Sequence, residues 1–98
     1  MWFLSQINNK QLAEFIETSV SEGKSEEALK CLDELISAGE DAELYYLRGR
    51  LKWKLGRKTD AISDYSKAVA IDENSPAAQA LSMAREIMDF YNQDMYNP

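Results

Sequence analysis

The sequence predicts an all-α protein of five helices, arranged as two helical hairpins followed by a closing helix. Three observations lead to this fold class. Apolar residues recur at helical spacing along most of the 98 residues. The chain holds only four Gly and two Pro, and both Pro lie in its last quarter, which favours long helices over many short strands. Small and turn-forming residues also recur 33 positions apart, as a repeated structural unit requires.

The first hairpin is predicted over about residues 9–41. Its first helix, over about 5–22, carries an apolar stripe formed by Ile7, Leu12, Phe15, Ile16 and Val20. Gly23 should end that helix, because glycine adopts positive φ without strain. Ser25 is expected to cap the second helix, which should end near Gly39.

The second hairpin is predicted over about 42–75, with helices over about 42–55 and 59–71 joined at Gly56. It repeats the first hairpin at the offset of 33 residues. The matching pairs are Gly23 with Gly56, Ala28 with Ala61, Leu29 with Ile62, and Leu32 with Tyr65. Each hairpin is therefore interpreted as one copy of the same helix–turn–helix unit.

Gly49 and Ala61 are the positions where the two helices of the second hairpin should come close together. Neither has a bulky side chain, so the helices can approach there while larger apolar residues fill the surrounding space. A larger residue at Gly49 should overpack the pair and cost about 1–3 kcal/mol.

Residues 45–72 resemble one nearly complete tetratricopeptide repeat, and residues 12–72 together resemble two such repeats. The resemblance rests on the aromatic Tyr45, on Gly49, and on Ala61 followed four residues later by Tyr65. Three residues depart from the family pattern: Arg48, Lys52 and Glu73 stand where Leu, Tyr and Pro are expected.

Ser75 and Pro76 are predicted to start a closing helix over about 76–92, with Ser75 as its cap and Pro76 in its first turn. This helix should cover the apolar face that the second hairpin would otherwise expose. Its methionines, Met83 among them, are expected to fill gaps in the core, and the alternative interpretation is that they form an adaptable surface. Residues 93–98 carry no helical stripe and are expected to form a non-helical tail. The ending resembles that of very small stand-alone bacterial proteins with two tetratricopeptide repeats and a C-terminal capping helix.

In the family, the first helices of successive repeats line a concave face that contacts a peptide. Carried over by position, the resemblance implies groove contacts by Ala13, Glu17, Glu43, Tyr46, Arg50, Trp53 and Lys54. One known mode of the family holds the C-terminal carboxylate of a ligand with Lys and Asn on successive first helices. Because Ala13 and Glu17 occupy the first-helix places in this chain, that mode is not predicted here.

Tyr46, Arg50, Trp53 and Arg57 follow a helical spacing and should share one helix face. Aromatic side chains next to arginine side chains are typical of the centre of a protein-binding site. The face therefore predicts a groove for an acidic or aromatic partner segment. In the alternative interpretation, Trp53 packs inward against the first or the closing helix and the basic residues are simply solvated.

The formal net charge of −6 disfavours general nucleic-acid binding, which needs a basic face. The charge is nevertheless uneven, since six of the eleven basic residues fall within 48–58 with no acidic residue between them. This stretch leaves open a less favoured function, that of an accessory subunit which binds a polyanion.

The sequence offers little support for an enzyme or for a cofactor site. The chain has no His, so the usual general base near neutral pH and the commonest metal ligand are absent. Cys31 lies between Leu29 and Leu32 in a helical pattern, which is typical of a small apolar residue. No apolar run is long enough to span a membrane, and a single thiol fits a reducing compartment, so a cytoplasmic protein is expected.

The predicted function is non-enzymatic protein–protein interaction, with a peptide or partner segment bound in the concave groove. The alternative is a structural homo-oligomer, down to a weak homodimer, in which another copy fills the groove or contacts the N-terminal cluster Trp2, Phe3 and Leu4. In the other interpretation of that cluster, it packs on the first helix of its own chain.

Overall fold

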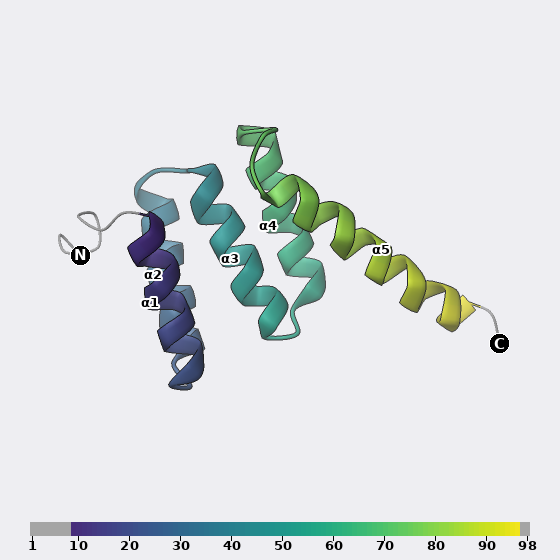
Figure 1. Cartoon of the computed structure of the whole chain (residues 1–98), viewed down its shortest axis with the longest axis horizontal. Helices are drawn as coiled ribbons and strands as arrows, with labels where there is room; N and C mark the ends of the chain where they lie inside the picture. Colours follow the sequence, from purple (N-terminus) through teal and green to yellow (C-terminus); the bar gives the residue numbers. More distant parts are fainter. Residues whose placement is uncertain (1–8, 97–98) are drawn as a thin grey trace.

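The chain folds into five α-helices, which pack as two hairpins and a fifth helix lying across the second hairpin (Figure 1). The computed structural model describes residues 9–96, with side chains from residue 10 to residue 90. The helices are α1 (Asn9–Ser21), α2 (Ser25–Ala38), α3 (Ala42–Lys54), α4 (Lys58–Ile71) and α5 (Ala77–Tyr96). The predicted all-α fold of two hairpins and a capping helix is confirmed.

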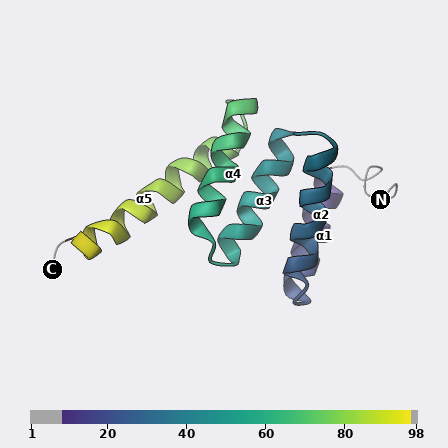
Figure 2. The same ribbon diagram turned by 180° about the vertical axis from the view of Figure 1, so that it is seen from behind.

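The helices lie in two layers. In Figure 1, α1 lies in front of α2 and α5 lies in front of α4, and both orders are reversed in Figure 2, which shows the molecule from behind. The first helix of the chain and the fifth helix therefore lie on the same face, with α2 and α4 behind them.

Two glycines end the first helices of the hairpins, as predicted. Gly23 has a φ of 75° and Gly56 a φ of 83°, in the left-handed region that only glycine adopts at little cost. At the second turn, the backbone N–H of Arg57 donates to the Lys52 carbonyl at 2.9 Å, and that of Gly56 to the Trp53 carbonyl at 3.0 Å. These bonds satisfy the last carbonyls of α3 and turn the chain into α4.

The helix starts follow the prediction at α5 but not at α2. The Ser75 Oγ accepts a hydrogen bond from the Ala77 backbone N–H at 3.1 Å, which confirms Ser75 as the cap of α5. Ser25 is instead the first residue of α2, and Lys24 before it makes no side-chain hydrogen bond to the helix. The predicted cap at Ser25 is therefore wrong.

The helix α5 is longer than predicted. It continues to Tyr96, whereas the sequence predicts a non-helical tail from residue 93. Its 20 residues correspond to about 30 Å, so its C-terminal part extends past α4, which has 14 residues (Figure 1). The predicted start of the first helix at residue 5 and the cluster of residues 2–4 lie outside the described residues.

Two apolar clusters hold the helices together, and α3 contributes to both. The first cluster joins α1, α2 and α3, and its buried members are Leu12, Ile16, Ala28, Leu29, Leu32, Leu47 and Leu51. The second cluster is built mainly on α4 and α5, and its buried members are Ile36, Tyr45, Ala61, Tyr65, Ala68, Ala77, Leu81 and Ala84. By packing on α4, α5 covers the apolar face that the second hairpin would otherwise expose.

Gly49 lies at a close approach of α3 and α4. A Cβ atom added to Gly49 would stand 2.7 Å from Cε1 and 2.8 Å from Cδ1 of the Tyr65 ring, and 3.2 Å from the Ala61 carbonyl oxygen. Carbon atoms in favourable contact are about 3.5–4.0 Å apart, so the site has no room for a side chain. The predicted close approach at Gly49 is confirmed.

Phe15 does not belong to the buried face of α1, contrary to the predicted stripe. Its exposed fraction is 36%, whereas Leu12 and Ile16 are each 4% exposed. Ser19 completes the buried face instead, because residues 12, 16 and 19 follow the i, i+4, i+7 spacing of one helix face. Phe15 lies at the edge of that face.

Candidate functional site

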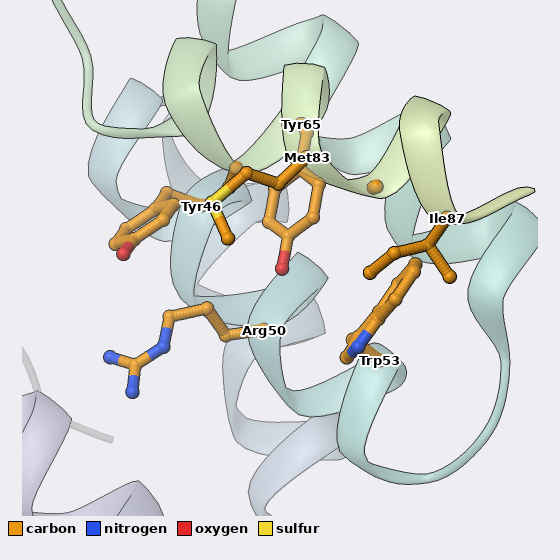
Figure 3. A pocket seen from close by; sticks show the side chains of 8 residues that line it. Tyr46, Arg50, Trp53, Tyr65, Met83 and Ile87 are labelled. Atoms are coloured by element: carbon orange, nitrogen blue, oxygen red, sulfur yellow. The ribbon is translucent and has the colours of Figure 1, made fainter.

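A groove runs between α3 and α5, and Tyr65 of α4 also lines it (Figure 3). Its first pocket, of about 230 Å³, is lined by Tyr46, Arg50, Trp53, Tyr65, Ala80, Met83, Ala84 and Ile87. Its second pocket, of about 490 Å³, is lined by Trp53, Lys58, Glu86, Ile87 and Phe90. Because Trp53 and Ile87 line both pockets, the two form one surface, called the α3–α5 groove below.

Aromatic rings form one wall of the groove. The ring centroids of Tyr46 and Tyr65 are 6.1 Å apart and the ring planes are tilted by 40°, an arrangement in which aromatic pairs attract one another. Burial raises the pKa of the Tyr65 hydroxyl above its ordinary value. From α5, Met83 and Ile87 border the same pocket while remaining 56% and 38% exposed (Figure 3). The groove is thus apolar on the side of Tyr46 and Tyr65 and also on the side of α5.

Trp53 belongs to the core and to the groove at once. Its half-buried side chain packs against the second apolar cluster and also lines both pockets. The Lys58 Nζ lies 4.4 Å from the centroid of the indole ring, within the range of a cation–π interaction. The two interpretations of Trp53 are therefore compatible, because the side chain packs against the core and also lines the groove.

Arg50 lines the groove, but its charge is directed toward α1. Its Nη2 lies 3.3 Å from the Glu17 Oε1, and the Lys54 Nζ lies 2.8 Å and 2.9 Å from the two oxygens of the same carboxylate. The hydrogen bond and the charge of Lys54 lower the pKa of Glu17. In Figure 3 the Arg50 guanidinium points away from Tyr65 and Trp53, and it lies on the side of Tyr46.

Glu43 and Ala13 do not line the groove. Glu43 is half-buried at the start of α3, and burial, followed by the nearby charge of Asp41, raises its pKa. Ala13 packs against the first apolar cluster. Of the seven predicted contact residues, three line the groove (Tyr46, Arg50 and Trp53), and Lys54 and Glu17 lie next to Arg50. Contact of any of the seven with a partner stays a prediction.

The sequence-based prediction missed the contribution of α4 and α5 to the groove. The missed lining residues of the first pocket are Tyr65, Ala80, Met83, Ala84 and Ile87. The signal was present, because positions 80, 83, 84 and 87 follow the i, i+3, i+4, i+7 spacing of one helix face. Met83 was expected in the core, and its 56% exposure shows that this expectation is wrong.

Two of the departures from the repeat pattern, Arg48 and Lys52, meet at a single carboxylate. The Arg48 Nε and Nη2 donate to the two oxygens of Asp64 at 2.9 Å and 2.8 Å, and the Lys52 Nζ lies 3.1 Å from Asp64 Oδ2. Arg48 Nη1 also donates to Asp33 of α2 at 2.9 Å. Asp64 is only 1% exposed, and its hydrogen bond raises the pKa of Arg48. These residues, called the Asp64 network, link α2, α3 and α4.

The rest of the basic stretch over 48–58 is also engaged within the fold. Arg57 lies beyond the end of α3, in the turn, and its Nη2 is 2.6 Å from Glu26 of α2. The prediction that Arg57 shares a helix face with Tyr46 is therefore wrong. Among the described residues, each cation of the stretch except Lys58 has a carboxylate within 4 Å. The stretch therefore presents no row of free positive charges of the kind that a polyanion binds.

Three further observations concern the remaining chemistry of the described residues. Cys31 is half-buried, and its burial raises the pKa of the thiol. Among the described residues, no three His, Cys, Asp or Glu side chains are arranged to hold a metal ion. Within the same part of the chain, every helix is too short or too polar to cross a membrane.

Comparison with known proteins agrees with this geometry. The tetratricopeptide repeat model matches residues 42–75. The solution NMR structure of Bacteroides fragilis protein BF1650 has a TM-score of 0.73 and 38% sequence identity to the chain, over 87% of this chain and 88% of that one. Among curated proteins, none matches the sequence.

The helical hairpins, the capping helix and these similarities define a small helical-repeat protein. The chain belongs to the tetratricopeptide repeat family. Repeats of this family generally serve as protein–protein interaction modules and are typically non-catalytic.

Proposed function

We propose that this protein is a non-enzymatic interaction module that binds a segment of a partner protein in the α3–α5 groove. The observation that carries the proposal is the open apolar wall of α5, where Met83 and Ile87 border a pocket lined by Tyr46, Trp53 and Tyr65. Exposed aromatic and aliphatic side chains gathered in a groove are the usual anchors of protein recognition. In this proposal the chain is one domain, with repeats over about 9–41 and 42–75.

The residues around the groove suit a partner segment that carries an apolar or aromatic side chain and that can also carry a carboxylate. Arg50 stands at one end of the groove, and Lys58 lies on Trp53 at the other. The apolar pocket between them has a volume of about 230 Å³, which suits one large side chain. A cytoplasmic setting accords with the single thiol, Cys31.

The test uses a library of random twelve-residue peptides, selected on the wild-type protein and then measured against the Met83→Glu variant. A carboxylate at position 83 would have to be desolvated by any apolar side chain that enters the pocket. We expect the selected peptides to lose affinity by about tenfold or more on this variant, which corresponds to about 1.4 kcal/mol. Fluorescence anisotropy of labelled peptides provides the dissociation constants.

Ser82→Glu is the matched control, since Ser82 is exposed on the same helix and lines neither pocket. It adds the same charge one residue away and should leave the affinities unchanged. Peptides that bind both variants as tightly as the wild type would place recognition elsewhere and reject the groove.

A second copy of the chain is the other candidate occupant, and the exposed side chains of α5 favour it. Met83, Ile87 and Phe90 are 56%, 38% and 64% exposed, and they follow one another at i, i+4 and i+7. Exposed apolar surface of this kind also suits self-association. Light scattering at high micromolar concentration decides the point, because a monomeric mass eliminates the homo-oligomer.

A further inference from the structure

The Glu17 carboxylate on α1 binds two basic side chains of α3: Arg50, which lines the first pocket, and Lys54, which lies one helical turn further along. Lys54 holds both carboxylate oxygens, at 2.8 Å and 2.9 Å, and Arg50 approaches one of them at 3.3 Å. Arg50 is the only basic residue that lines this pocket among the described residues. The one basic side chain of this pocket is therefore already paired with Glu17.

The Arg50 side chain is directed toward this contact. Its guanidinium carbon lies 5.8 Å from the centroid of the Tyr46 ring, and its nitrogens point away from the pocket (Figure 3). A guanidinium has five N–H donors and binds a carboxylate best through two of them at about 2.7–2.9 Å. The contact with Glu17 uses one nitrogen at a longer distance, so Arg50 retains the capacity to bind a second carboxylate better than it binds this one.

We propose that Glu17 is a built-in competitor, which holds Arg50 and Lys54 in place of the carboxylate of a partner segment. This inference rests on the proposed function of the groove. A partner with an acidic residue beside its apolar anchor would displace Glu17 from Arg50 and place its own carboxylate there. Affinity for acidic segments is then limited by the internal contact, while affinity for the apolar anchor is not.

The internal contact is weak enough to be displaced. The side chains of Arg50, Lys54 and Glu17 are 40%, 38% and 51% exposed. Ion pairs between side chains as exposed as these contribute little to stability. Releasing Glu17 should also leave α1 in place, because Leu12 and Ile16 of α1 pack in the first apolar cluster with Leu47 of α3. The competitor can therefore be removed without unfolding the first hairpin.

The experiment compares two blocked dipeptides, acetyl-phenylalanyl-aspartate amide and its asparagine counterpart, which differ only in the charge of the second side chain. Each is titrated into ¹⁵N-labelled protein, and the amide resonances of α3 and α5 report binding. In the wild type we expect the two peptides to bind equally within about twofold. In Glu17→Gln the aspartate peptide should bind roughly three- to fivefold more tightly than the asparagine peptide, as expected for release of an exposed ion pair.

Glu14→Gln is the matched control. Glu14 is an exposed carboxylate on the same helix without an ion-pair partner among the described residues, and its removal changes the net charge by the same amount. We expect it to leave the ratio of the two affinities at the wild-type value. A ratio that rises equally in both variants would mean that net charge alone is responsible, and it would overturn the competitor role.

The remaining outcomes separate this inference from the proposal that it rests on. If both peptides bind the groove and their ratio is the same in Glu17→Gln as in the wild type, the competitor role is rejected and the groove stands. If neither peptide shifts a resonance of α3 or α5 in any variant at millimolar concentration, both the groove and the competitor role are rejected.

Discussion

Replacing Asp64 with alanine is expected to lower the free energy of unfolding by about 3 kcal/mol, because it leaves Lys52 without its carboxylate, and Arg48 with Asp33 alone, in a largely buried site. The side chain of Asp64 is 2% exposed, and those of Arg48 and Lys52 are 14% and 19% exposed. Water therefore cannot fully replace the lost partner. Urea unfolding followed by circular dichroism measures the change.

Asp33→Ala is the control, since Asp33 binds the same Arg48 guanidinium but is 59% exposed. Its loss should cost less than about 1 kcal/mol, as is usual for an exposed ion pair. If the Asp33 and Asp64 variants lose equal stability, then burial of Asp64 is not what makes it important. A small loss for both would show that the Asp64 network contributes little to folding.

The Asp64 network explains why the sequence alone misjudged the basic stretch over 48–58. Within the stretch no acidic residue interrupts the cations, so they appeared to form a basic surface. The carboxylates that pair with them come from other helices, between 12 and 37 residues away in the sequence. Such pairs depend on how the helices pack, and helix packing cannot be read from the spacing of residues within one helix. Asp64 itself occupied an unremarkable polar place in a helical pattern.

The parts of the fold that were predicted correctly depend on local chemistry or on the repeat offset. The turns at Gly23 and Gly56 could be predicted from the conformational freedom of glycine alone. The cap at Ser75 could be predicted from the residues that directly follow it. Gly49 and Ala61 were located by comparing the repeat pattern with the chain. The predicted cap at Ser25 failed, although it used the same local reasoning as Ser75, and the structure offers no physical reason for the difference.

The candidate groove was predicted in part. The face of α3 that carries Tyr46, Arg50 and Trp53 follows from helical spacing, and it does line the groove. The opposite wall was sought on α1, where Glu17 instead binds the cations of α3. The wall is provided by α5, whose apolar face is wide enough to pack on α4 with Leu81 and Ala84 and still present Met83 to the groove. A capping helix thus also shapes the candidate site.

Gly49→Ala is expected to lower the free energy of unfolding by about 1–2 kcal/mol, even though alanine is the better helix former. In an open helix position the exchange of Gly for Ala stabilises by about 1 kcal/mol. At Gly49 the added Cβ would meet the buried Tyr65 ring at 2.7 Å and the Ala61 carbonyl oxygen at 3.2 Å. Overpacking of this kind costs about 1–3 kcal/mol, and the cost should lie in the upper half of that range because a ring that is 5% exposed has little room to move. After the gain in helix propensity, a net loss of about 1–2 kcal/mol remains. Gly49→Leu should cost more.

Thermal unfolding tests the sign as well as the size of the effect, since 1 kcal/mol lowers the Tm of a domain of this size by about 4–8 °C. Gly39→Ala is the control, because its Cβ would meet nothing within 4 Å and its backbone is extended. It should change stability by less than about 0.5 kcal/mol. In a Tyr65→Leu background, which removes the ring atoms nearest to the added Cβ, Gly49→Ala should cost less than in the wild type. A Gly49→Ala variant at least as stable as the wild type would mean that α3 and α4 can separate freely, and the close contact would then not determine how the second hairpin packs.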